Sequence, residues 1–169
     1  MKINIKELAV FAMLAAVMCV SKFITEWLPN VHLLGVFIVA ITVVYRTKAL
    51  FPLYTFVFLI GLFYGFPTWW IPYIYLWAVL WGMTMLLPRN LPDKVKPFLY
   101  IGVCGLHGFL YGTLYAPAQA LLFGLDFKGM VTWIIAGLPW DLVHGVSNLV
   151  CGLLIMPIII ALKQAQKYI

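Results

Sequence analysis

Long apolar runs follow one another along the whole chain and constrain its fold more than any other feature. Prolines or basic residues separate these runs. They cover residues 5–28, 33–45, 49–65, 71–87 and 98–123, and a last run begins between 133 and 139 and ends near 162. A helix needs about 20 apolar residues to cross the hydrocarbon core of a bilayer. The pattern predicts an all-α membrane protein, a bundle of about six transmembrane helices that forms a single domain over residues 1–169.

The composition supports this fold class. Hydrophobic residues make up 65% of the chain and charged residues 9%, whereas a soluble domain is about half apolar and a quarter charged. The net charge of +6 is spread between the apolar runs rather than gathered on one patch, which argues against nucleic-acid binding. Cys19, Cys104 and Cys151 lie inside apolar runs without CxxC or metal-ligand spacing. We therefore interpret them as buried hydrophobic residues and expect neither a metal nor a cofactor.

The N-terminus resembles a signal peptide only in part. Lys2 and Lys6 precede an apolar stretch, but no good A-x-A cleavage site follows, and the apolar character continues to Leu28. We interpret this segment as a retained first helix.

The basic residues predict the orientation in the membrane. With six spans and a cytoplasmic N-terminus, nine of the eleven Lys and Arg residues face the cytoplasm, all except Lys22 and Lys128. The positive-inside rule then places both termini in the cytoplasm of a multi-pass protein of the bacterial cell membrane. The second run is short, since its 13 residues span only about 20 Å of a core about 30 Å thick. It is either a short helix beside a thinned or water-filled region, or a re-entrant pair with the third run that leaves Arg46 and Lys48 outside.

Polar side chains on the last two runs share helical faces. Asp141, His144 and Asn148 follow each other at i, i+3 and i+7, which places them on one face. The fifth run carries polar and aromatic residues at every fourth position, namely His107, Tyr111, Tyr115 and Gln119. With the predicted orientation, most of these groups converge on the outer side, where the first outer loop adds Glu26, Asn30 and His32. An apolar, aromatic-walled cavity with a few oriented polar groups is typical of a small-molecule site.

Several of these residues also have structural explanations. Asp141 follows Pro139 by two positions and could satisfy first-turn N–H groups. Lys22 and Glu26, at i and i+4, could neutralise each other, and His107 could make a single helix–helix hydrogen bond. Ala12 and Ala16 form a small-xxx-small pair that favours close packing, either inside the bundle or against another membrane protein.

In these features the chain resembles the substrate-binding S components of energy-coupling factor (ECF) vitamin transporters. The features are the six-helix layout, the basic N-terminus before the alanine-rich Ala12-Met-Leu-Ala-Ala16, and the segment Gly137-Leu-Pro-Trp-Asp-Leu-Val-His-Gly-Val-Ser-Asn148. The resemblance implies capture of a vitamin or related micronutrient outside the cell. It also implies a transmembrane coupling subunit, contacted by Ala12 and Ala16, and two cytoplasmic ATPases. The substrate-binding residues that we expect are Trp77, Tyr111, Tyr115, Gln119, Trp140, Asp141, His144 and Asn148.

Two other functions compete with transport. One is an intramembrane metal-dependent enzyme that uses Asp141, His144 and His107, because acid and histidine pairs bind metals inside helical bundles. The sequence contains no HExxH, no GxSxG and no second acid–histidine pair, so we expect a binding protein rather than an enzyme. The other is an assembly protein whose aromatic residues only pack.

Overall fold

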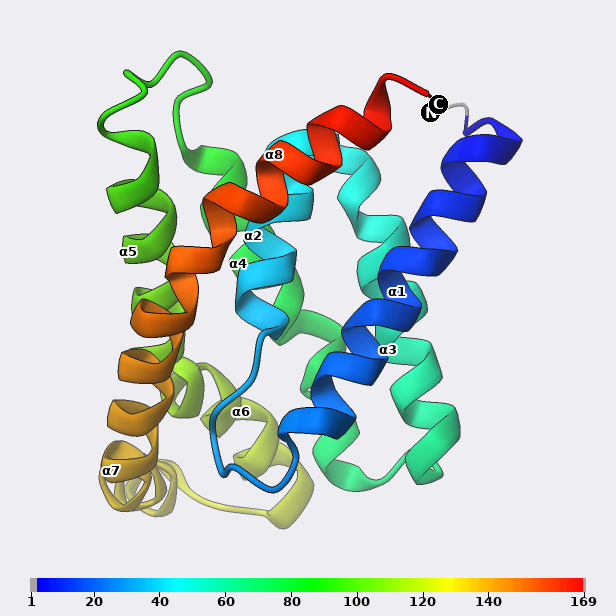
Figure 1. Cartoon of the computed structure of the whole chain (residues 1–169). Coiled ribbons are helices and arrows are strands. Elements are labelled where there is room, and N and C mark those ends of the chain that lie inside the picture. Colours follow the sequence, from blue (N-terminus) through cyan, green and yellow to red (C-terminus); the bar gives the residue numbers. More distant parts are fainter. Residues whose placement is uncertain (1–2, 169) are drawn as a thin grey trace.

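The computed structural model describes residues 3–168, which form helices and connecting turns without any strand (Figure 1). Lys2 lies outside the described residues. The α-helices are α1 (Ile5–Thr25), α2 (Leu34–Tyr45), α3 (Leu50–Tyr64), α4 (Tyr73–Leu86), α5 (Lys96–Phe109), α6 (Tyr111–Phe123), α7 (Phe127–Cys151) and α8 (Ile155–Gln166). Short 3₁₀ turns are η1 (Arg46–Ala49), η2 (Thr68–Trp70) and η3 (Gly152–Leu154). Four helical stretches are long and apolar enough to cross a membrane, namely Ile5–Thr25, Leu34–Tyr64, Lys96–Phe123 and Phe127–Gln166.

The chain passes back and forth between two ends of the bundle (Figure 1). One end, which we call the terminal end, holds the start of α1, the end of α8, η1 and the loop 87–95. The opposite end, which we call the far end, holds the loops 26–33, 65–72 and 124–126. Lys6 Nζ donates to the carbonyl of Tyr168 at 3.2 Å, which joins the two described termini.

The turn between α2 and α3 lies at the terminal end. Arg46 has a φ of 52°, which lies outside the right-handed helical region, so α2 ends there. Two contacts to α4 hold the turn: Arg46 Nη2 donates to the carbonyl of Met85 at 3.0 Å, and Trp81 Nε1 donates to the carbonyl of Arg46 at 3.1 Å. Lys48 pairs with Glu7 of α1. Arg46 and Lys48 therefore lie at the end of the bundle opposite to the loop 26–33.

The last two apolar runs differ from the sequence expectation. The fifth run, expected as one helix over residues 98–123, is broken at Leu110, and α6 lies at an angle to α5 across the far end (Figure 1). The sixth run begins at Phe127 rather than between 133 and 139, because Asp126 accepts a hydrogen bond from the N–H of Gly129 at 2.7 Å and caps α7. Pro139 consequently lies inside α7 instead of near its start.

The centre of the bundle is α2. Nine of its twelve residues are buried, which explains why it is apolar on every face. It packs against α4, α5 and α8. Next to it, α5 and α7 approach closely through glycines: a Cβ on Gly108 would meet the Cα of Gly145 at 2.8 Å, and one on Gly145 would meet the ring of Phe109 at 2.3 Å. Small residues allow such contact between membrane helices, and here they fix the helices that carry the candidate site.

Candidate functional site

Two adjoining cavities lie at the far end of the bundle. The first, of about 200 Å³, is lined by Lys22, Thr25, Glu26, Leu28, Pro29, Asn30, Val31, His32, Leu34, Tyr73, Tyr111 and His144. The second, of about 270 Å³, is lined by Asn30, Tyr111, Gly112, Tyr115, Gln119, Trp133, Gly137, Trp140 and Asp141. Asn30 and Tyr111 border both. Loop 26–33, the start of α2 and helices α1, α4, α6 and α7 thus border two neighbouring spaces.

Aromatic and imidazole rings form the inner wall of the first cavity. The rings of Tyr111 and His144 have centroids 4.6 Å apart, and those of His32 and His144 are 4.5 Å apart. Trp77 lies behind them, with its ring centroid 5.9 Å from that of Tyr111 and 5.7 Å from that of His107. All three histidines of the chain therefore belong to one cluster, although they come from three separate segments.

The two histidines of the helices differ in their hydrogen bonds. His107 Nε2 lies 3.0 Å from the carbonyl of Leu76, which matches the single helix–helix bond considered for it. His144 is 2% exposed, and neither of its ring nitrogens bonds to any residue in the range 3–168. A neutral imidazole offers one donor and one acceptor, and leaving both unused in an apolar interior is costly. His144 thus lines the first cavity with two buried ring nitrogens that have no partner among the described residues.

Asp141 links α7 to the start of α6. Its Oδ1 accepts a hydrogen bond from the N–H of Gly112 at 2.8 Å, so the carboxylate satisfies a first-turn N–H group of α6 and not of its own helix. A Cβ on Gly112 would meet Asp141 Oδ2 at 2.5 Å, which explains the need for glycine there. Oδ2 is buried and has no partner among the described residues. One oxygen therefore fixes the side chain, and the other remains available to the second cavity.

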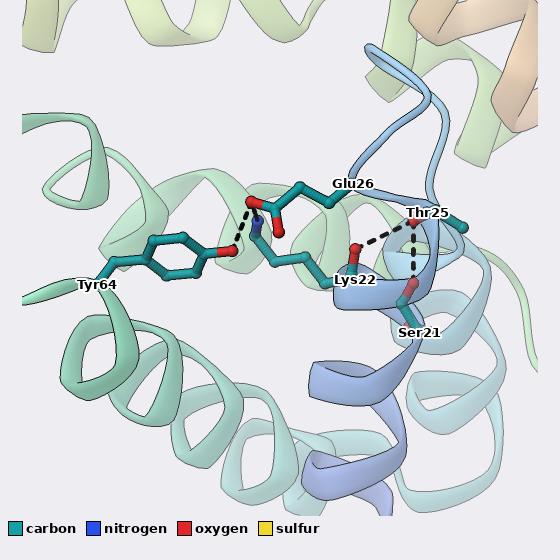
Figure 2. A network of polar contacts seen from close by, with 5 residues as sticks. All are labelled: Ser21, Lys22, Thr25, Glu26 and Tyr64. Carbon is teal, nitrogen blue, oxygen red and sulfur yellow. Dashed lines mark hydrogen bonds and ion pairs between the residues drawn. The ribbon is translucent and has the colours of Figure 1, made fainter.

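A charged cluster lies beside the first cavity, to whose lining Lys22 and Glu26 contribute (Figure 2). Tyr64 donates to Glu26 Oε1 at 2.5 Å, and Lys22 Nζ lies 3.8 Å from the same oxygen. The ammonium of Lys22 also lies 4.8 Å from the ring centroid of Tyr64 and 5.8 Å from that of Trp69. The neutralising pair inferred from the i, i+4 spacing is present, but α3 and η2 add aromatic contacts to it.

The expected substrate-binding residues do not all reach the cavities. Tyr111, Tyr115, Gln119, Trp140, Asp141 and His144 line them. Trp77 is fully buried behind the wall. Asn148 lines neither cavity: its Nδ2 donates to the carbonyl of Cys104 at 3.1 Å, and it joins α7 to α5. A direct contact of Asn148 with a ligand stays a prediction, although its position favours a role in helix packing.

Other residues of the cavities were not in the expected set. His32 and Tyr73 contribute rings, Asn30 separates the two spaces, and Trp133 stacks on Tyr115 with centroids 5.6 Å apart. The polar composition of loop 26–33 was a signal for Asn30 and His32. Trp133 stood at the possible start of the last run, and its spacing gave no comparable signal of a site.

Burial affects the titration of His32. This side chain lies in the loop between α1 and α2, and its Nδ1 is screened from solvent without a partner among the described residues. Removal from water lowers the pKa of His32 from its ordinary value of 6.5 to about 4, with smaller contributions from His107 and Lys22. His32 is therefore neutral at physiological pH.

The alanine pair of α1 faces away from the bundle. Ala12 and Ala16 are exposed, whereas Ala15 between them is buried. Close packing of Ala12 and Ala16 inside the bundle, one of the two interpretations of the spacing, is therefore wrong. The exposed pair leaves a shallow, small-residue face on which another helix could approach.

The clustered histidines are not arranged like the ligands of a metal ion. Over residues 3–168, no set of three or more His, Cys, Asp or Glu side chains is arranged to hold a metal ion. Of the trio considered for a metal-dependent enzyme, Asp141 accepts a bond from Gly112, and His107 is bonded to Leu76.

Comparison with protein families, curated proteins and solved structures finds no match to this chain.

Proposed function

We propose that this protein is the substrate-binding membrane subunit of an ECF-type transporter. It binds a vitamin or related micronutrient on the extracellular side and delivers it through a complex with a transmembrane coupling subunit and two cytoplasmic ATPases. The chain itself performs no chemical reaction and acts in the bacterial cell membrane.

The observation that carries the proposal is the convergence of unused polar atoms on two adjoining cavities. His144 and Asp141 are buried, and each presents at least one atom without a partner among the described residues. Aromatic rings from α4, α6 and α7 surround them. A flat, partly polar heterocycle suits such a site, because stacked rings bury its faces while few polar groups fix its edge. Vitamins and their precursors commonly have this chemistry.

The proposed topology has six spans, with both termini and the loop 87–95 in the cytoplasm. The distribution of basic residues supports it, since Arg46, Lys48, Arg89, Lys94 and Lys96 belong to the terminal end. At the far end, Lys128 follows the loop 124–126 and Lys22 is paired with Glu26. The positive-inside rule then makes the far end extracellular, so the cavities open toward the side from which a nutrient arrives.

The proposed partner face is the exposed alanine pair of α1. Small side chains let a second helix approach closely and gain van der Waals contact along its length, which drives association in lipid. Ala12 and Ala16 provide such a face on the outside of the bundle, and the resemblance to S components assigns docking of the coupling subunit to this face.

Mass spectrometry of small molecules extracted from the purified protein tests the proposal. The protein is produced in its native host and purified without added nutrient, so that a tightly bound ligand stays with it. We expect one organic compound at close to one molecule per chain, and copurification of two ATPases with a larger membrane protein. A preparation that contains zinc or iron in stoichiometric amount and no organic compound would contradict the proposal and favour the metal-dependent enzyme.

A further inference from the structure

A larger cavity lies at the terminal end, away from the candidate site. Its volume is about 380 Å³, and its walls come from α2, η1, α4, the loop 87–95, α5 and α8. The lining residues are Val43, Arg46, Thr84, Leu87, Pro88, Arg89, Asp93, Lys96, Tyr100, Met156, Ile159, Ile160 and Lys163. None of them belongs to either far-end cavity.

Positive charge dominates the lining. It contains four cationic side chains and one carboxylate, that of Asp93. Asp93 is 94% exposed and pairs with Lys96 at 2.6 Å. Within residues 3–168, no carboxylate lies at ion-pair distance from Arg46, Arg89 or Lys163. The fold thus gathers cations from four separate segments around one space and leaves most of their charge uncompensated.

Two of these cations, Lys96 and Lys163, lower the pKa of Asp93. The hydrogen bond from Lys96 and the charges of Lys96 and Lys163 hold the pKa of Asp93 below its ordinary value of 3.8. Lys163 belongs to α8 and Asp93 to the loop before α5, so charges far apart in the sequence act on the same space.

Both the backbone and the side chain of Arg46 are constrained. Its backbone has a φ of 52°, a region that non-glycine residues rarely adopt. One terminal nitrogen is bonded to the carbonyl of Met85, while Nε is buried without a partner among the described residues. A guanidinium presents its donors as a planar fork that matches two oxygens of a phosphate group. The bond to Met85 therefore holds the Arg46 side chain in place beside the cavity.

The remaining wall is apolar. Val43, Leu87, Met156, Ile159 and Ile160 line the cavity beside the cations. Ile160 is 54% exposed on α8, so this wall continues onto the outer surface of the bundle, where lipid chains would lie. A lining that combines cations with aliphatic groups complements an amphiphile with an anionic head.

We propose that this cavity binds a phosphate ester, with its phosphate on Arg46, Arg89, Lys96 and Lys163. The headgroup of an anionic phospholipid of the cytoplasmic leaflet is the source that the apolar wall favours, because basic pockets between membrane helices bind such headgroups. A soluble phosphate compound has the same anionic chemistry but makes no use of the aliphatic wall. The site is independent of the proposed vitamin binding at the far end.

Thermal unfolding of the full-length protein in a neutral detergent tests the proposal. The unfolding temperature is followed by tryptophan fluorescence during titration with short-chain phosphatidylglycerol. Parallel titrations use short-chain phosphatidylcholine, whose headgroup is zwitterionic, and inorganic phosphate. The variants Arg89→Gln and Lys163→Gln each remove one exposed cation of the cavity. Lys94→Gln removes the same charge from the same loop at a position that does not line the cavity.

We expect phosphatidylglycerol to raise the unfolding temperature at lower concentration than phosphatidylcholine. The apparent affinity should fall about tenfold in Arg89→Gln and in Lys163→Gln, since a hydrogen bond to a charged group is typically of that strength, and should stay unchanged in Lys94→Gln. Equal stabilisation by inorganic phosphate, with the same dependence on the variants, would keep the phosphate site and make its source soluble. An equal loss in Lys94→Gln, or no difference between the two lipids and no effect of phosphate, would overturn the proposal.

Discussion

The imidazole rings of His32 and His144 meet edge to face, with centroids 4.5 Å apart. His32 belongs to the loop between α1 and α2, and His144 lies in the middle of α7. The contact therefore joins a loop of the far end to the helix that carries most of the candidate site. It places two rings with unused nitrogen atoms on the border of the first cavity.

Replacement of His144 should separate stability from binding. His144→Phe removes two buried nitrogens that have no partner among the described residues, so the unfolding free energy should stay within about 1 kcal/mol of wild type. Ligand affinity should fall roughly ten- to a hundredfold, because one partner of a buried hydrogen bond is lost. Thermal unfolding and equilibrium binding of the extracted ligand measure the two quantities.

His107→Phe is the matched control for this experiment. It breaks the bond between His107 and the carbonyl of Leu76, so it should reduce stability by about 1 kcal/mol more than His144→Phe does. A His144→Phe protein that is folded and binds as tightly as wild type would show that His144 does not contact the ligand.

Replacement of Asn148 distinguishes a role in helix packing from a role in ligand binding. Its amide donates to the carbonyl of Cys104, and it lines neither far-end cavity. Asn148→Ala should therefore lower the unfolding free energy by about 1–3 kcal/mol while the folded protein keeps most of its ligand affinity. Loss of affinity in a protein of wild-type stability would instead place Asn148 in the binding site.

The stability of the ligand-free protein should depend on pH through His32. Its pKa is about 4 in the folded protein and near 6.5 when unfolded, so the unfolded chain binds more protons between these values. The unfolding free energy should fall as the pH drops from about 6.5 to about 4, by at most about 3 kcal/mol from this group. Denaturation at several pH values should show a smaller decline in His32→Asn. Identical declines in both proteins would contradict this assignment.

The alanine face of α1 can be tested through complex formation. Ala12→Trp and Ala16→Trp place a large side chain on an exposed surface, so folding and ligand binding should be unchanged. Copurification with the coupling subunit and nutrient uptake should be lost, because a bulky side chain prevents close helix contact. Met13→Trp, on a neighbouring exposed position of the same helix, is a control for bulk alone. Loss of ligand binding in the alanine variants would point to damage inside the bundle.

Much of the layout could be predicted because apolar runs end where prolines and basic residues begin. The ends of α2 and α4 follow this rule at Arg46 and Pro88. This rule does not predict the break at Leu110 or the tilt of α6 against α5. Both features lie next to the close contact of Gly108 with Gly145, which joins residues far apart in the sequence. The early start of α7 depends on the single cap at Asp126.

Helical spacing predicted which residues share a face of α7 but not how far along the helix each side chain lies. Asp141 and His144, one turn apart, both reach the far-end cavities. Asn148 shares their face, but seven residues advance a helix by about 10 Å, which carries its side chain past the cavities to Cys104. His32 could be recognised as a polar loop residue, whereas its contact with His144 depends on how the loop folds over α7 and has no signal in the sequence.

The most direct test of the proposed function is the dissociation constant of the extracted ligand for variants of the two cavities. Tyr111 borders both cavities, and Gln119 borders the second; Gln164 is an exposed residue of α8 at the terminal end and gives a matched control for Gln119. We expect Tyr111→Leu to weaken binding at least about tenfold and Gln119→Ala to weaken it measurably, whereas Gln164→Ala should bind as wild type does. Wild-type affinity in a folded Tyr111→Leu protein would contradict the proposed function.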